Sequence, residues 1–357
     1  LKHRKRKKMV EAQPRKEMEM RSLGPSGLKV SVLSYGNWLT SNDKSAEEST
    51  TACIKRCWEH GINFFDTAEI YGNGNAEIIM GNALKALNVP REQLVISTKL
   101  IKGGETVNER GLSRKHIIEG LNNSLKRLQL DYVDVVFCHR PDSETPIEET
   151  VRAMNYLIEK GKAFYWGTSE HSAEEIQQIY AVCDKYGLIK PIVEQPQYNM
   201  LCRERFEVEY GTLFDKYRMG STIWSPLAGG ILTGKYNFGI PAGSRFENAQ
   251  NFSYATYMGD EEKKKKTVAI IEKLTEVAKG LDCTLAQLAL AWAIANKDVS
   301  TAIFGATKVE QVDDNVKAVE IYKKLTPEIS EKIEEILGNR PKTPMNFKTW
   351  SPFPPRR

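Results

Sequence analysis

Four polar side chains of different chemistry stand at the ends of short apolar segments: a carboxylate, a phenol, an amine and an imidazole. Asp66, Lys99 and His139 each follow such a segment directly, and Tyr71 comes five residues after Asp66. Short apolar segments bounded by turn residues are typical of buried parallel strands. Polar residues at the C-terminal ends of such strands form the active site of an α/β barrel. Any one of the four could be an ordinary residue at a strand end, but all four in this order indicate a site that moves protons.

The reduction of a carbonyl group needs these residue types, because the developing alkoxide needs an acid while hydride reaches the carbon. A free tyrosine has a pKa of about 10 and is a poor acid at neutral pH, but a nearby lysine ammonium lowers that pKa. We therefore predict Tyr71 as the acid, Lys99 as the group that lowers its pKa, Asp66 as the partner of Lys99, and His139 as a hydrogen-bond partner of the substrate oxygen. A nicotinamide cofactor would supply the hydride. No metal is required, since no histidine stands at ligand spacing with another histidine or cysteine.

Apolar segments of strand length alternate with helical patterns along most of the chain, which favours a parallel sheet with right-handed crossovers. Eight strands are predicted, at 30–33, 62–65, 94–98, 133–138, 164–167, 192–194, 221–224 and 301–304. Helices are predicted near 46–60, 75–87, 113–128, 147–160, 173–186, 204–217, 262–279, 285–295 and 309–319, with one more beginning at the Thr326-Pro327 pair.

Eight strand–helix units fit a (β/α)8 TIM barrel with additional helices. The alternative is a doubly wound sheet, but the glycines at 72 and 74 lack the full dinucleotide-binding fingerprint. The region 226–262 has a weak pattern and is rich in Gly, Pro and Asn, so we expect it to cover a bound ligand. The helix start after the eighth strand, at Gly305 to Lys308, stands where barrels bind phosphate, and Lys308 and Arg245 could neutralise a 2′-phosphate and so select NADP over NAD.

The basic charge is concentrated at the N-terminus. Residues 1–16 carry eight Lys and Arg side chains against one Glu, or +7, so a net charge of +5 leaves the remainder at −2. A solvated, disordered arm is the favoured interpretation; a nuclear-import signal, a nucleic-acid arm and an anionic-membrane tether are alternatives. We therefore divide the chain into an arm (1–20), a barrel (21–340) and a proline-rich tail (341–357). No segment is apolar enough to span a membrane or to serve as a secretory signal, and the six scattered cysteines fit a cytoplasmic protein.

The region from 21 to about 341 resembles an aldo-keto reductase, and within that superfamily the branch of the voltage-gated potassium channel beta subunits. The resemblance rests on the motifs at 64–71, 111–120, 131–135, 148–154, 165–169, 224–228 and 336–339. It implies a (β/α)8 barrel that binds NADP(H) and reduces aldehydes or ketones, with Tyr71 as general acid supported by Lys99, Asp66 and His139. It also implies a homotetramer, and a potassium channel alpha subunit as a partner besides the small carbonyl substrate.

The resemblance further implies a set of cofactor contacts by position. The nicotinamide end would meet Trp38, Asp66, Ser169, Gln195, Trp224, Ser225, Pro226, Leu227 and Ala228. The adenosine-phosphate end would meet Lys235, Arg245, Gly305, Thr307, Gln311, Asp314 and Asn315.

Two positions depart from parts of that branch. Animal channel subunits carry asparagine where this chain has His139, and some relatives carry arginine at the position of Glu170, so no cofactor contact is assigned there. The histidine favours a reductase over the competing function, a cytoplasmic regulatory beta subunit that docks on a channel and uses NADP(H) as a redox sensor. Nucleic-acid binding through the arm is the least favoured hypothesis.

Overall fold

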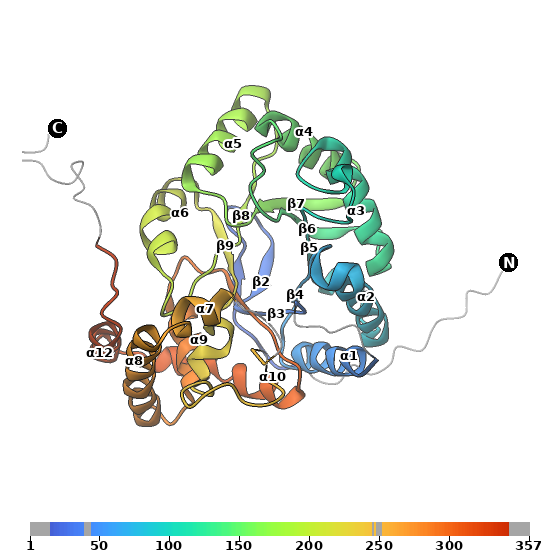
Figure 1. Ribbon diagram of the computed structural model, residues 1–357. Helices are drawn as coiled ribbons and strands as arrows, with labels where there is room; N and C mark the ends of the chain where they lie inside the picture. Colours follow the sequence, from blue (N-terminus) through green and yellow to red (C-terminus); the bar gives the residue numbers. More distant parts are fainter. Residues whose placement is uncertain (1–14, 39–43, 245, 248–251, 343–357) are drawn as a thin grey trace, which may run out of the picture.

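Eight parallel strands close into a barrel in this computed structural model, which describes residues 15–38, 44–244, 246–247 and 252–342. Neighbours around the barrel follow the chain, with the last strand closing onto the first (Figure 1). The fold is therefore a (β/α)8 barrel, as predicted, and not a doubly wound sheet. Its strands are β3 (Leu33–Gly36), β4 (Phe64–Asp66), β5 (Val95–Leu100), β6 (Val133–Cys138), β7 (Ala163–Thr168), β8 (Val193–Glu194), β9 (Gly220–Ile223) and β10 (Thr301–Phe304).

Seven of the eight predicted strands are confirmed, and the first is wrong in position. The segment 30–33 divides between β2 (Lys29–Ser31) and the start of β3. β2 pairs with β1 (Met20–Ser22) in an antiparallel hairpin outside the barrel. All four residues from Val30 to Leu33 are buried, so the pattern does not mark the point where the hairpin ends and the barrel begins.

The predicted helices are present, two of them as pairs of shorter elements. The segment 204–217 forms a π-helical turn (Arg205–Glu209) and then α6 (Gly211–Tyr217), and the segment 309–319 forms α10 (Val309–Asn315) and the start of α11 (Ala318–Ile321). The other helices are α1 (Lys44–Glu59), α2 (Asn75–Leu87), α3 (Arg114–Leu128), α4 (Ile147–Glu159), α5 (Ala173–Tyr186), α7 (Phe252–Met258), α8 (Glu261–Gly280), α9 (Leu285–Ala295) and α12 (Pro327–Leu337).

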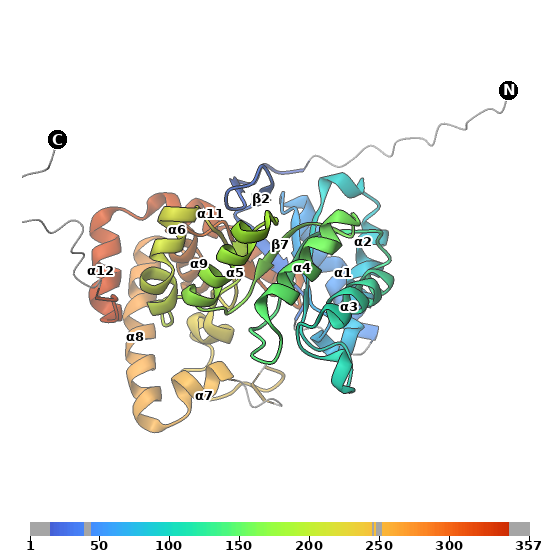
Figure 2. The same cartoon turned by 90° about the horizontal axis from the view of Figure 1, so that it is seen from above.

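The hairpin closes the N-terminal end of the barrel. Leu23 and Val30 of the hairpin region share one apolar cluster with inward-facing strand residues such as Phe64 and Val135. A Cβ at Gly24 would overlap the carbonyl oxygen of Ile192, so the hairpin turn lies directly against the barrel wall. Figure 2 shows the hairpin at one end of the barrel and α7 at the other. With the N-terminal end filled, a ligand has access from the C-terminal end.

The region 226–262 is not without structure. It contains a 3-10 segment (Ala228–Thr233) and α7, which lies at the C-terminal end of the barrel. The described part of the predicted arm is residues 15–20, and Met20 already belongs to β1. This part lies against the barrel: Lys16 N donates to Glu59 O, and the Arg15 guanidinium stacks 3.9 Å from the Trp58 ring. Residues 1–14 and the tail from 343 lie outside the described residues.

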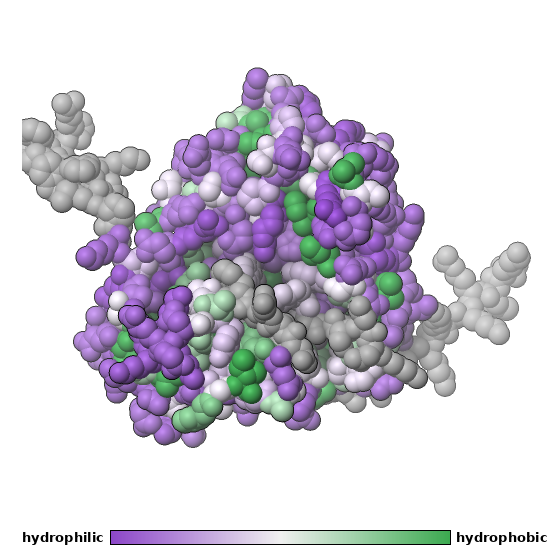
Figure 3. Space-filling view, in the orientation of Figure 1, coloured by the Kyte–Doolittle hydropathy of each residue, from purple (hydrophilic) through white to green (hydrophobic). Residues whose placement is uncertain are grey.

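No single described helix is long and apolar enough to cross a bilayer; α8 and α9 reach that limit only as a pair bent by 87°, and α9 is buried in the core. The face in Figure 3 is mostly hydrophilic, with its hydrophobic residues in small separate patches.

Candidate active site

Strand alternation brings three of the four proposed catalytic side chains to one place. Inward-facing residues recur at every second position, for example Val135 and Phe137 in β6, and the next inward position is His139. In β5, Val95 and Ser97 face the interior of the barrel, and Lys99 is the next residue in the same alternation. Asp66 stands two residues beyond the inward-facing Phe64. All three lie at the C-terminal end of the barrel, since the N–H of His139 donates to Leu100 O just beyond the last paired residues.

A short loop after β4 carries Tyr71 back over this end of the barrel. Thr67 N donates to Ser97 O and Glu69 N donates to Lys99 O, so β5 anchors the loop. Tyr71 then opens a 3-10 turn that leads into α2. Gly74 ends this turn with φ 89°, a conformation that favours glycine, and it lets the helix begin at once.

The amine of Lys99 is the centre of the cluster. Its Nζ donates to Asp66 Oδ2 at 2.5 Å, to Thr67 O at 2.7 Å and to the Tyr71 hydroxyl at 3.2 Å. Lys99 has no exposed surface, and Asp66 is 3% exposed. A buried ammonium with three acceptors is fully satisfied, so the geometry fixes its position beside the phenol.

Different causes keep the amine and the phenol protonated at neutral pH: the neighbouring Asp66 and Tyr71 for the amine, and burial for the phenol. Burial by itself lowers the pKa of Lys99, but the Asp66 carboxylate and the Tyr71 phenol outweigh it, and the pKa lies above its ordinary value. Burial raises the pKa of Tyr71, and the opposing effect of the Lys99 charge is smaller. The sequence-based expectation of a lowered tyrosine pKa is therefore wrong in its net direction, although the lysine acts in the expected sense. A phenol that retains its proton is suited to be a general acid.

His139 completes the cluster as a neutral imidazole. Its ring meets the Tyr71 ring edge-on, with centroids 5.6 Å apart. Burial, with the charges of Lys99 and Arg140, holds the pKa of His139 well below its ordinary 6.5. Its buried Nδ1 has no hydrogen-bond partner in the part of the chain that the structure describes. The neutral ring can donate one hydrogen bond without carrying a charge.

The depressed pKa of His139 predicts how stability changes with pH. Between the low folded-state pKa and the unfolded-state value of about 6.5 the unfolded chain binds the additional proton, so stability falls as pH decreases through that window. Below pH 6.5 the free energy of unfolding of His139→Asn should therefore fall less steeply with decreasing pH than that of the wild type, by up to about 1.4 kcal/mol per pH unit. Above pH 6.5 the two proteins should show the same pH dependence. Urea unfolding of both proteins from pH 8 to 5 measures the difference. Parallel curves for the wild type and the variant would contradict the assignment.

Two further predicted residues, Gln195 and Ser169, adjoin the cluster. Gln195 Nε2 donates to Asp66 Oδ1 at 3.3 Å and to Thr222 Oγ1 at 3.1 Å, and Ser97 Oγ donates to the same Asp66 oxygen at 2.6 Å. Ser169 Oγ donates to the backbone oxygen of Gln195. A hydroxyl and an amide at neighbouring strand ends, both nearly fully buried, are chemically suited to hold a carboxamide.

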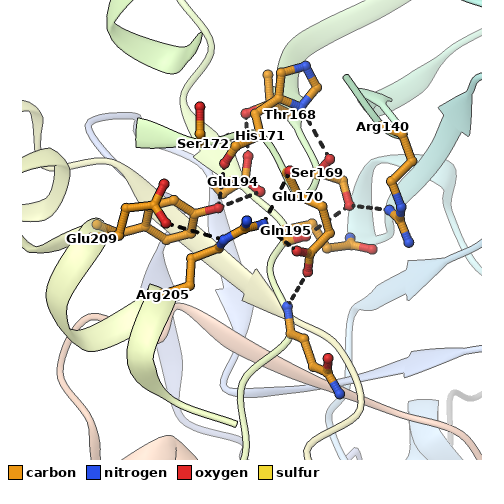
Figure 4. A network of polar contacts seen from close by, with 12 residues as sticks. Arg140, Thr168, Ser169, Glu170, His171, Ser172, Glu194, Gln195, Arg205 and Glu209 are labelled. Carbon is orange, nitrogen blue, oxygen red and sulfur yellow. Dashed lines mark hydrogen bonds and ion pairs between the residues drawn. The ribbon is translucent and has the colours of Figure 1, made fainter. Parts of the chain in front are cut away.

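Trp224 directly follows β9, and its position depends on Glu170. Glu170 Oε1 accepts from the indole Nε1 at 2.9 Å and from Gln197 N at 2.6 Å, while Oε2 accepts from Arg205 at 2.8 Å. Figure 4 shows this carboxylate beside the Arg205 guanidinium. Glu170 itself adopts φ 58°, uncommon for a residue with a side chain. Its role is to fix the indole, which sequence reasoning missed because its partners lie 27 to 54 residues away.

Removal of this carboxylate should be costly. Glu170→Ala leaves the indole N–H and the Gln197 N–H without their acceptor, and we expect a loss of about 1–3 kcal/mol in the free energy of unfolding. Glu105→Ala is the control, because it removes a carboxylate from an exposed ion pair with Lys102. Urea unfolding monitored by tryptophan fluorescence should show a lower midpoint for Glu170→Ala only. Equal midpoints for the two variants would show that Glu170 does not hold the indole in place.

The residues predicted for the adenosine-phosphate end lie on several separate segments of the chain. Gly305 and Thr307 are exposed after β10, and Lys235 is exposed after the 3-10 segment. The side chain of Gln311 accepts from Thr307 N at 2.8 Å and so closes the first turn of α10. Asp314 accepts from Gln287 Nε2 at 2.6 Å at the start of α9.

The remaining predicted contacts vary in exposure. Trp38 is 50% exposed, with its ring 6.3 Å from that of Tyr71. Ser225 and Leu227 are partly buried, and Pro226, Ala228 and Asn315 are buried. Arg245 lies outside the described residues. The flat face of the Trp224 indole and the Ser169–Gln195 pair are chemically suited to a nicotinamide ring and its carboxamide.

The whole barrel matches one known family. The Aldo/keto reductase family matches residues 32–337, most of the chain. The chain belongs to the aldo/keto reductase family. Oxidoreductase activity is the activity that this family implies, and the family generally binds NAD(P)H.

Relatives of high identity carry the names of channel subunits. The chain is 49% identical to the "Probable voltage-gated potassium channel subunit beta" of Arabidopsis thaliana. The aligned 334 residues make up 93% of this chain and all of that protein. The protein of the same name from Oryza sativa subsp. japonica is 48% identical with the same coverage. The "Putative voltage-gated potassium channel subunit beta" of Schizosaccharomyces pombe is 51% identical over 329 residues, 91% of this chain and 95% of that protein.

Proposed function

We propose that this chain is an NADPH-dependent reductase of aldehydes and ketones. One aldehyde, one NADPH and one proton would give one primary alcohol and one NADP⁺. The observation that supports it most strongly is the Lys99 amine held between the Asp66 carboxylate and the Tyr71 hydroxyl.

Each residue of the cluster has one task in this reaction. A bound nicotinamide nucleotide would supply the hydride, a proton with two electrons, for the carbonyl carbon. Tyr71 donates its phenolic proton to the carbonyl oxygen, and the ammonium of Lys99 stabilises the tyrosinate that remains. Asp66 keeps Lys99 charged and in place, and the neutral His139 donates a hydrogen bond to the same oxygen. Ser169, Gln195 and Trp224 would hold the nicotinamide, while Lys235, Arg245 and Lys308 would favour a 2′-phosphate.

The test is nucleotide consumption with aromatic aldehydes such as 4-nitrobenzaldehyde. The purified protein should oxidise NADPH only when the aldehyde is present, and it should form the alcohol in equal amount. We expect the KM for NADH to exceed that for NADPH. Absence of alcohol with either nucleotide would reject the reductase assignment.

A second candidate function is supported by the names of the relatives. A regulatory beta subunit of a voltage-gated potassium channel would act as a tetramer at the cytoplasmic side of the membrane and would retain the cofactor as a redox sensor. Co-expression with the tagged channel from the same organism tests it, because a true subunit purifies with the channel at fixed stoichiometry. Recovery of the channel without this chain would reject this function and leave the reductase proposal untouched.

A further inference from the structure

Arg140 is a charged group at the mouth of the site that takes no direct part in the proposed proton transfer. It directly follows His139 and is exposed. Its Nη1 donates to the backbone oxygen of His139 at 2.5 Å and to Ser169 Oγ at 3.0 Å. Figure 4 shows the guanidinium beside Ser169, apart from the Glu170–Arg205 pair. These two bonds fix one corner of the guanidinium at the ends of β6 and β7.

No acid neutralises this guanidinium among the residues that the structure describes. The acidic side chains on the same loops have other partners: Glu170 is bound by Arg205 and by the Trp224 indole, and Asp142 accepts from Leu112 N and from the Thr145 hydroxyl. Glu194 is fully buried, and burial raises its pKa to about 8, so it is mostly uncharged at pH 7. Arg140 therefore brings an uncompensated positive charge to the rim of the site.

The charge lies close to the reacting groups. After burial and Lys99, Arg140 is the third cause that holds the pKa of His139 below its usual range. The centre of its guanidinium is 6.0 Å from the Trp224 ring. Both anchoring bonds use Nη1, so Nη2 and Nε make no hydrogen bond within the described residues. The geometry leaves one edge of the guanidinium for a planar, negatively charged partner.

We propose that Arg140 makes this site selective for carbonyl substrates that carry an anionic group, a carboxylate or a phosphate. The anion would pair with the guanidinium while the carbonyl oxygen meets Tyr71 and His139. This inference deepens the proposed function and rests on it. It assigns Arg140 to substrate recognition, separate from proton transfer.

Two para-substituted aldehydes of similar shape test the proposal. 4-Carboxybenzaldehyde is anionic and 4-nitrobenzaldehyde is neutral. The kcat/KM for the anionic aldehyde divided by the kcat/KM for the neutral one, measured within one protein, reports charge recognition. In Arg140→Gln this ratio should fall about 10- to 100-fold, the usual effect of one charge-assisted hydrogen bond. Arg140→Lys should retain part of the ratio. Arg218→Gln is the control, because Arg218 precedes β9 at the opposite end of the barrel, and it should keep the wild-type ratio.

An equal loss on both aldehydes in Arg140→Gln would overturn the proposal. So would an unchanged ratio with a raised KM for NADPH, which would assign the guanidinium to the nucleotide. If the wild type reduces neither aldehyde, the reductase proposal fails, and titration calorimetry with 4-(hydroxymethyl)benzoate still tests the anion site. A Kd for 4-(hydroxymethyl)benzoate at least ten-fold lower in the wild type than in Arg140→Gln would support the anion site. Equal Kd values would overturn it.

Discussion

Tyr71→Phe should lower kcat for aldehyde reduction by about 10²- to 10⁴-fold, the usual contribution of a positioned general acid. The substitution removes one oxygen and leaves the ring in its contacts with Trp38 and His139. We therefore expect the folded structure and the affinity for the nucleotide to be retained. Because burial raises the pKa of Tyr71, the wild-type acid keeps its proton, so its rate should not fall between about pH 6 and 9.

Steady-state kinetics at saturating NADPH measure this effect. Tyr217→Phe is the matched control, since Tyr217 ends α6 at the opposite end of the barrel and packs on Tyr180. It should retain wild-type kcat. A Tyr71→Phe enzyme with wild-type kcat would remove the phenol from the mechanism.

Lys99→Met should destabilise the fold by about 3–5 kcal/mol and abolish measurable reduction. The substitution leaves the Asp66 carboxylate buried with no cation, while the Tyr71 hydroxyl and Thr67 O lose their donor. The loss of a cation beside the developing tyrosinate adds to the barrier. This single change therefore reduces both stability and rate.

Urea unfolding separates the charge effect from the packing effect. The double variant Asp66→Asn with Lys99→Met should recover part of the lost stability, because no isolated charge is then buried, yet it should remain inactive. Lys102→Met, which removes a lysine from a surface pair with Glu105, should leave the unfolding midpoint unchanged. A Lys99→Met variant as stable as wild type would contradict the observed ion pair.

The catalytic cluster is readable from the sequence because strand alternation is regular. Val95, Ser97 and Lys99 share one face of β5, as do Val135, Phe137 and His139 of β6 and its continuation, so polar residues after apolar ones mark the end of the barrel interior. The first strand was misplaced for the converse reason. Val30 is buried in the hairpin and Leu33 is buried in the barrel, and burial alone does not distinguish the two.

The parts of the site that the sequence did not predict depend on long-range contacts and on desolvation. Glu170 meets Trp224 and Arg205 across 54 and 35 residues, and no local pattern encodes that meeting. The net direction of the Tyr71 pKa depends on how much water burial removes, which the presence of Lys99 in the sequence does not tell. The charge of Arg140 was visible beside His139, but its lack of an acidic partner among the described residues required the fold.

The most direct test of the account is the fate of a deuterium label on the nicotinamide. Unlabelled 4-nitrobenzaldehyde is incubated with the protein and NADPH deuterated at the transferring C4 position, and the alcohol is analysed by proton NMR. We predict one deuterium on the alcohol carbon of each product molecule, and a Tyr71→Phe protein that forms almost none on the same time scale. An alcohol without deuterium, or equal label transfer by Tyr71→Phe, would contradict the claim that this cluster donates the proton in a hydride reduction.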